Sequence, residues 1–153
     1  MALNLSSTSF AAGVNIPKQF TCDGEDRSPE LHWGKPPAGT KSFVLIADDP
    51  DAPVGTWVHW VLFNLPASTH NLPEATPKKE ILESGTLQGQ NDFRKIGYGG
   101  PCPPPGKPHR YFFKLYALDT VLTLKAGSTK ADIERTMKSH ILAQGEYMGR
   151  YGR

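Results

Sequence analysis

Glycine and proline recur along the whole chain, and they restrict the fold more than any other sequence feature. The 153 residues include 15 glycines and 14 prolines, or 29 residues and about 19%, where an average protein has about 12%. Both residues interrupt helices, because glycine loses backbone entropy on ordering and proline lacks an N–H donor. A helical bundle is therefore disfavoured, and a β-rich domain is expected.

Charge and hydrophobicity limit the class of protein. Seventeen lysines and arginines balance 15 aspartates and glutamates, which is too even for a sequence-independent nucleic-acid binder. An apolar content of 38% with a small net charge argues against disorder. No run of 18 apolar residues occurs, so no membrane insertion is expected. The first ten residues lack the basic and apolar regions of a signal peptide, which predicts a cytoplasmic protein.

The two cysteines, Cys22 and Cys102, are far apart in the sequence. In a reducing compartment this favours two buried thiols over a disulfide. Neither cysteine has a histidine at zinc-ligand spacing. The sequence therefore predicts no metal and no cofactor.

No linker or repeat divides the chain, so residues 1–153 are expected to form a single domain. Apolar runs predict strands at 41–49, 57–65, 111–118 and, briefly, 147–151. The segment 66–92 is typical of a loop, with one turn of helix near 77–82. Alternation along the second strand predicts one shared face for these residues: Trp57, His59, Val61 and Phe63.

One segment, 130–144, has the pattern of an amphipathic helix. Thr129 is a suitable N-cap, Asp132 completes a capping box, and Gly145 follows the segment as a stop signal. Three apolar residues fall on one face: Ile133, Met137 and Ile141. The sum is a sheet-dominated domain with one accessory helix.

Polar side chains gather at three junctions between loop and strand: Asp49 and Asp51, then His59, then His109, Arg110 and Tyr111. A histidine in an apolar strand is costly unless its nitrogens find partners. Taken alone, His59 is more often a satisfied core residue. The rigid proline-glycine segment 97–106 alters this balance, because a concave rim beside two histidines and a tyrosine suits an anion.

Two blocks carry a resemblance to a known family: DDPDAPVGTWVHWVLFNLP at 48–66 and GYGGPCPPPGKPHRYFFKLYALD at 97–119. They closely resemble the phosphatidylethanolamine-binding protein family, which includes the Raf kinase inhibitor protein and plant flowering-time regulators. The compact length and the block FTCDGEDRSPELHW at 20–33 are similar to its bacterial and archaeal branch. The resemblance covers the chain from about Phe10 to its end. Eukaryotic members have a longer C-terminal helix beside their pocket, and this chain ends after a short tail.

The resemblance implies a mainly β fold, an antiparallel two-sheet β-sandwich with Greek-key connections and one or two short helices. It also implies a cis bond before Pro53 and a small cavity that accepts phosphate-like anions. The implied ligand-binding residues are Asp49, His59, Gly100, Pro101, His109 and Tyr111. The implied structural residues near the pocket are Pro50, Asp51, Pro53, Pro103, Pro104 and Arg110.

Each of these groups has a physical role in such a site. An anion needs donors, which the imidazoles of His59 and His109, the Tyr111 hydroxyl and free N–H groups at residues 99–100 would supply. Asp49 would hold a histidine tautomer. Arg110 alternates away from the pocket, so we expect it to pair with an acidic loop residue such as Asp51.

These features predict a non-enzymatic binding protein for a small anionic or phosphorylated ligand, which modulates a kinase or another signalling partner. The alternatives use the same Asp/His pocket, either as a hydrolase in which Asp49 and His59 activate water or as a protease or kinase inhibitor. No G-x-S-x-G motif supports a serine nucleophile. Two histidines and a carboxylate could also form a metal triad, but their spacing does not support one. A homodimer is left open.

Overall fold

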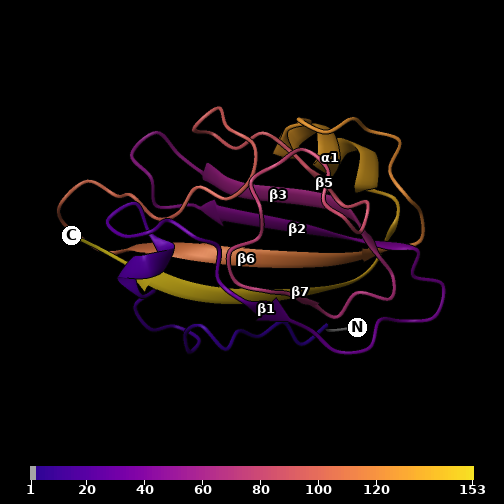
Figure 1. Ribbon diagram of the computed structural model, residues 1–153, viewed down its shortest axis with the longest axis horizontal. Helices are drawn as coiled ribbons and strands as arrows, with labels where there is room; N and C mark the ends of the chain where they lie inside the picture. Colours follow the sequence, from indigo (N-terminus) through magenta and orange to yellow (C-terminus); the bar gives the residue numbers. More distant parts are fainter. Residues whose placement is uncertain (1–2) are drawn as a thin grey trace.

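A five-stranded antiparallel sheet with the order β5-β3-β2-β6-β7 forms the centre of the computed structural model, which describes residues 3–153 (Figure 1). Its strands are β2 (Ser42–Asp49), β3 (Trp57–Pro66), β5 (Leu87–Gln88), β6 (His109–Leu118) and β7 (Ile141–Tyr151). A small second antiparallel sheet pairs β1 (Leu31–His32) with β4 (Asn71–Leu72). The helices are a single 3-10 turn, η1 (Lys18–Phe20), and α1 (Lys130–Met137).

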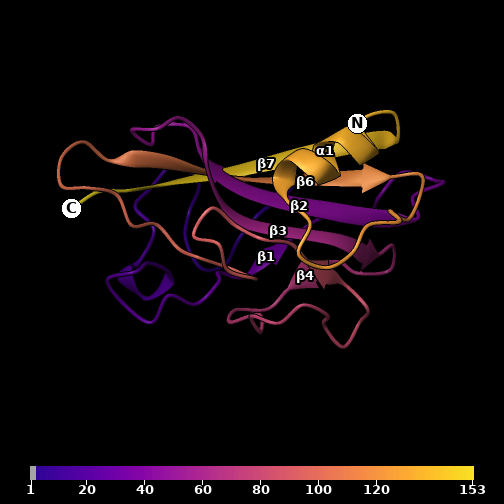
Figure 2. The same cartoon turned by 90° about the horizontal axis from the view of Figure 1, so that it is seen from above.

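The large sheet is covered on both faces. Strand β2 lies in its centre and all eight of its residues are buried, which explains its continuous apolar run. On one face, Val44 and Ile46 pack against Ile133 and Met137 of α1. The other face packs against the small sheet and the N-terminal segments in a larger core around Trp60. Figure 2 shows α1 on one side of the large sheet and β1 and β4 on the other.

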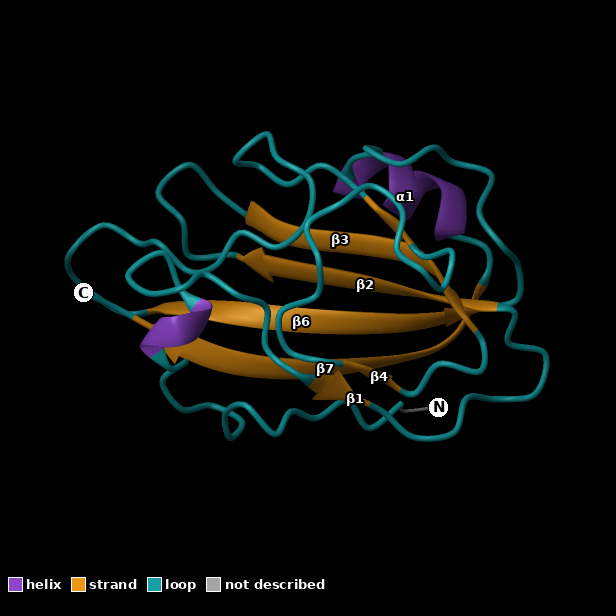
Figure 3. Cartoon of the chain, in the orientation of Figure 1, coloured by secondary structure: helices purple, strands orange, loops and turns teal. Residues whose placement is uncertain are grey.

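Strands and loops make up most of the molecule and helices little of it, as Figure 3 shows. The expected mainly β, antiparallel fold is therefore confirmed. Strands β2, β3 and β6 lie where the apolar runs predict them, whereas β7 is much longer than the brief strand expected at 147–151. The segment 66–92 contains β4 and β5 in addition to loop. The turn of helix expected at 77–82 is absent from the described structure.

The prediction of a helix over 130–144 is wrong in its length. The capping box at Thr129 and Asp132 is present, but α1 ends at Met137. Ile141 begins β7 and is 38% exposed, so it does not share the buried face of Ile133. Strand pairing explains the difference, because β7 is aligned with nearly the whole length of β6, and these ladder hydrogen bonds outweigh helical periodicity.

The predicted alternation along β3 is also wrong, because a β-bulge interrupts it. Ala47 pairs with Trp60 and Asp48 with Val58, which leaves His59 as the extra residue of β3. Val61 and Phe63 pack on the α1 side, whereas the His59 ring meets Tyr111 on the opposite side. A bulge that re-aims one side chain is typical of strands beside functional sites.

The expectation of two buried thiols is corrected by a disulfide between Cys22 and Cys102, whose Cα atoms are 5.4 Å apart. Both residues are solvent-exposed. The pairing joins positions 80 residues apart, so no local motif could indicate it. The cis bond expected before Pro53 is also wrong, since residues 3–153 contain no cis peptide bond.

No helix in the described part of the chain is long and apolar enough to cross a membrane.

Candidate functional site

A pocket of about 210 Å³ lies at the end of the large sheet where β2 ends and β3 and β6 begin. This is the end near the C-terminus in Figure 1. The pocket is lined by Asp49, Ala52, Pro53, Val54, Trp57, His59, Phe93, Cys102, Pro103, Pro104, His109 and Tyr111. Four residues predicted to bind the ligand, Asp49, His59, His109 and Tyr111, are thus brought together from three strands.

Asp49, the last residue of β2, orients His109, the first residue of β6. The Nδ1 atom of His109 lies 2.7 Å from Oδ2 of Asp49, and because a carboxylate only accepts, Nδ1 carries the proton. The other carboxylate oxygen, Oδ1, accepts the N–H of Asp51 at 2.7 Å. Both oxygens of Asp49 are therefore occupied, and Nε2 of His109 is the ring atom left for a ligand.

His59 is fixed in the same way by a backbone carbonyl. Its Nδ1 lies 2.7 Å from the oxygen of Gly99, so Nδ1 donates and Nε2 remains for the pocket. Burial lowers the pKa of His59 below its usual value, because desolvation disfavours the imidazolium. At neutral pH the ring is therefore neutral, and Nε2 is a hydrogen-bond acceptor rather than the donor that the sequence predicts.

Tyr111 supplies the only buried side-chain polar atom of the pocket that has no hydrogen-bond partner among residues 3–153. Tyr111 is 3% exposed, and its hydroxyl makes no hydrogen bond to any of these residues. Burial and the nearby Asp49 carboxylate raise the pKa of Tyr111 above its usual value, so the hydroxyl keeps its proton. Leaving a buried donor unsatisfied is costly, so this hydroxyl is a polar group of the pocket wall with unused hydrogen-bonding capacity.

Aromatic and proline side chains form the rest of the pocket wall. The Phe93 ring meets Trp57 and His59 edge-on, with centroids 5.5 Å away in both cases. Gly99 allows this approach, because a Cβ atom there would lie 2.6 Å from the Phe93 ring. Phe93 comes from a loop with no recognisable pattern, so sequence reasoning missed it.

Gly100 and Pro101, which the resemblance implies as ligand-binding residues, are not among the residues that line this pocket. The Gly100 N–H donates to Asp26 at 2.8 Å, and the Pro101 carbonyl accepts from the Cys22 N–H. The N–H of Gly99 is also occupied, by the carbonyl of His59 at 2.9 Å. The segment therefore offers no free N–H at residues 99–100, because these groups hold the rim to its neighbours.

Arg110 lies on the opposite face of β6 and pairs with Asp51, as expected from the alternation. Its Nε and Nη2 each donate to the Asp51 carboxylate at 2.9 Å, and its backbone N–H does so as well. Hydrogen bonds from Arg110 lower the pKa of Asp51 to about 2. The pair anchors the loop after β2, in which Pro53 lines the pocket and Pro50 is exposed outside it.

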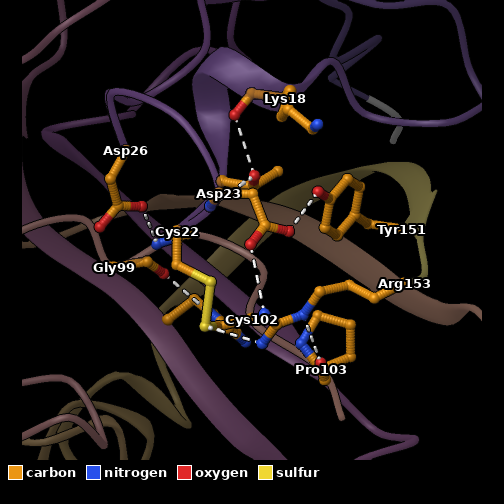
Figure 4. The surroundings of a disulfide bond; sticks show 12 residues. Lys18, Cys22, Asp23, Asp26, Gly99, Cys102, Pro103, Tyr151 and Arg153 are labelled. Carbon is orange, nitrogen blue, oxygen red and sulfur yellow. Dashed lines mark hydrogen bonds and ion pairs between the residues drawn. A yellow bond between two sulfur atoms is a disulfide. The ribbon is translucent and has the colours of Figure 1, made fainter. Parts of the chain in front are cut away.

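The disulfide and Arg153 hold the proline rim in place (Figure 4). The Nε of Arg153 donates to the Pro103 carbonyl at 2.8 Å, and its Nη1 lies 3.2 Å from Oδ1 of Asp23. Cys102 itself lines the pocket. One wall of the pocket is thus tied covalently to the segment that follows η1.

No group of three or more His, Cys, Asp or Glu side chains suited to a metal ion occurs within the described residues. The pair of His109 and Asp49 uses Nδ1 and Oδ2 on each other. The groups that remain at the pocket, two Nε2 atoms and a hydroxyl, can donate protons to or accept protons from a small polar ligand.

Comparison with known proteins shows which family the chain resembles. Residues 6–152 match the family model of the phosphatidylethanolamine-binding proteins. A UPF0098 protein of Methanothermobacter thermautotrophicus is 48% identical over 151 residues, covering 99% of both chains. One from Aquifex aeolicus is 51% identical and covers 99% of this chain and 89% of the relative.

Two solved structures from the same family are similar to this chain over nearly its whole length. The crystal structure of Escherichia coli YbcL, described as a member of the mammalian PEBP family, superposes with a TM-score of 0.93 at 34% identity and covers 100% and 99% of the two chains. CT736 of Chlamydia trachomatis, a homologue of the same family, gives a TM-score of 0.90 at 40% identity and covers 99% and 98%. The chain belongs to the phosphatidylethanolamine-binding protein family.

Proposed function

We propose that this protein is a non-enzymatic binding protein whose pocket takes the phosphate-like group of a small anionic or phosphorylated ligand. The observation that supports this most directly is the Tyr111 hydroxyl, a buried donor without a partner among residues 3–153. It lines the same pocket as His59 and His109. A tetrahedral oxyanion presents several acceptor oxygens, which suits the Tyr111 hydroxyl as a donor together with an imidazolium at His59 that forms when the anion binds.

The size of the pocket restricts what enters it. A volume of about 210 Å³ is smaller than the range of about 300–1,000 Å³ for drug-sized ligands. The pocket therefore takes a headgroup and not a whole lipid or peptide. The phospholipid in the family's name carries such a phosphate, and so does a phosphorylated side chain of a kinase or another signalling partner.

Both histidines are held in position before a ligand enters the pocket. Asp49 has both oxygens occupied, by His109 and by the Asp51 N–H, and so acts as a positioning residue. His59 is anchored by the Gly99 carbonyl. Neither ring needs to move to receive an anion through Nε2.

Sulfate affinity is expected to rise as the pH falls from 8 to 6. In the free protein burial lowers the pKa of His59, so the ring is neutral and Nε2 accepts. A bound dianion favours the imidazolium and raises that pKa. The complex therefore holds more protons than the free protein, and affinity increases by up to about tenfold per pH unit for one proton.

Calorimetric titration with sulfate in two buffers of different ionisation enthalpy measures this proton uptake. Sulfate is a suitable probe because it does not titrate in this range. The His59→Gln variant should take up about one proton fewer and lose about 1.5–3 kcal/mol of binding free energy at pH 6, the range for a charge-assisted hydrogen bond. Equal sulfate affinity at both pH values, or in both proteins, would contradict the proposal.

Tyr111→Phe separates the pocket's role in binding from its role in folding. The change removes only a hydroxyl that is buried and lacks a partner among residues 3–153, so the free energy of unfolding should stay equal or rise by about 1 kcal/mol. Sulfate binding should weaken by about 1.5 kcal/mol, since a donor to a charged oxygen is lost. Denaturant titration and calorimetry measure the two effects. A loss of stability with unchanged sulfate affinity would show that the hydroxyl is structural.

The alternative function is hydrolysis, and the Asp49–His109 pair is the observation in its favour. A carboxylate that holds Nδ1 of a histidine leaves Nε2 as a general base. Turnover of p-nitrophenyl phosphate or p-nitrophenyl acetate by the wild type, lost in Asp49→Asn, would replace binding with catalysis as the function. An inhibitor role would instead show as stoichiometric inhibition of a protease or kinase that sulfate competes away.

A further inference from the structure

A second, basic groove lies next to the pocket at the same end of the sheet. It has a volume of about 470 Å³ and is lined by Asp51, Lys107, Pro108, His109, Arg110 and Arg150. His109 is common to the groove and the pocket. Two consecutive residues of β6 therefore line different cavities. His109 pairs with Asp49 in the pocket, and Arg110 lies on the other face of the strand, in the groove.

The groove holds more positive charge than its own acid can balance. Three basic side chains, Lys107, Arg110 and Arg150, line it with a single carboxylate, Asp51. That carboxylate is taken by Arg110 in a two-point contact. Within residues 3–153, neither Lys107 nor Arg150 has a carboxylate within ion-pair distance.

The placement of Arg150 works against the stability of the sheet. Arg150 lies directly opposite Arg110 across β6 and β7. Its N–H donates to Val14 and its carbonyl accepts from Ile16, so both groups point away from β6. Arg110 and Arg150 therefore form a non-hydrogen-bonded pair, the kind in which the Cα atoms are closest, about 4.5 Å apart. Like charges in this position destabilise a sheet.

The same two strands show the ordinary arrangement four residues along β6. There Lys114 lies opposite Glu146, so the charges are complementary. An acidic residue at 150 would have given the same stabilisation beside Arg110. Asp51 balances the charge of Arg110, which leaves Arg150 without a carboxylate partner among residues 3–153, and an external anion in the groove would supply one.

From this we infer that the groove is a second anion subsite, and that the natural ligand carries two negatively charged groups. One group, phosphate-like, enters the pocket, and the second, a phosphate or a carboxylate, lies between Arg150 and Lys107. This inference rests on the proposed function, because it assigns the first group to the pocket. It adds the class of ligand, a small molecule or side chain with a second anionic group beyond its phosphate.

The test compares two series of probes by calorimetry: alkyl monophosphates and the α,ω-alkane bisphosphates of the same chain lengths. Monophosphates measure the pocket alone. At the best chain length, the bisphosphate should bind about tenfold tighter, well beyond the factor of two expected from its two equivalent ends. Equal affinities after that factor, at every chain length, would overturn the inference.

Variants that remove positive charge from the groove test whether the groove is the source of the bisphosphate's extra affinity. Lys107→Gln with Arg150→Gln should abolish the bisphosphate advantage and change monophosphate affinity by less than about threefold. Arg110 is kept, because it anchors the loop through Asp51. The matched control is Lys41→Gln with Lys125→Gln, which removes the same charge from exposed residues that line neither the pocket nor the groove and should keep the advantage. An equal loss for both probes in both variants would indicate net charge alone and overturn the subsite.

The two proposals fail in different ways. If the monophosphates bind and His59→Gln weakens them, the proposed function stands whatever the bisphosphates do. If the monophosphates do not bind, or His59→Gln leaves them unchanged, the pocket assignment fails and the inference fails with it.

Discussion

Replacing both Cys22 and Cys102 with serine is expected to lower the free energy of unfolding by about 4 kcal/mol. The disulfide closes a loop between positions 80 residues apart, and chain-entropy arguments give about 4.5 kcal/mol for a loop of this length. The loss should appear as a lower midpoint in a urea titration. Because Cys102 lines the pocket, sulfate affinity should fall as well.

The wild type in dithiothreitol is the control for this variant. Both cysteines are exposed, so the reductant can reach the bond without unfolding the protein. Reduced wild type should then have nearly the stability of the double serine variant, and the double variant should not respond to reductant. Equal midpoints for oxidised wild type, reduced wild type and the variant would contradict a stabilising disulfide.

Ile133→Ala is expected to cost about 2–5 kcal/mol of unfolding free energy, the usual range for removing a buried Ile side chain. Ile133 is completely buried between α1 and the large sheet, in the same cluster as Met137 and Val61. The change leaves a cavity that the sheet cannot close, because β2 and β3 are held by ladder hydrogen bonds on both sides.

Ile141→Ala is the matched comparison, since it makes the same chemical change at a residue that is 38% exposed. The cost should stay below about 1 kcal/mol, because little apolar surface returns to water. Urea titrations of both variants measure the difference. Equal costs would mean that Ile141 is buried on the helix face, as the periodicity of 130–144 suggests.

Much of the fold could be predicted from local patterns. The apolar run of β2 and the aromatic run of β6 needed no tertiary information, because burial on the core side requires such residues. The start of α1 was equally readable, since Thr129 and Asp132 satisfy each other's backbone within one turn. The end of α1 was not, because the partner that turns Ile141 into a strand residue is β6.

The sequence predicted which residue types form the site, but it did not predict how their side chains are oriented. Asp49, His59, His109 and Tyr111 stand at strand ends or in strands, where polar groups among apolar residues are costly and therefore informative. The bulge at His59 depends on the register between β2 and β3. A slip of one residue moves a side chain to the other face, and register is set by contacts distant in the sequence.

The sequence by itself determined the β-rich character of the chain, the start of one capped helix, and the chemistry available to this protein, a set of acids, histidines and a tyrosine between strands. Tertiary structure alone decided which atoms are free. Gly99 and Gly100 use their N–H groups to close the rim, the cysteines form a bond, and the Tyr111 hydroxyl lacks a partner within residues 3–153. Local patterns act through neighbours in the chain, whereas burial and hydrogen bonding depend on segments that folding brings together.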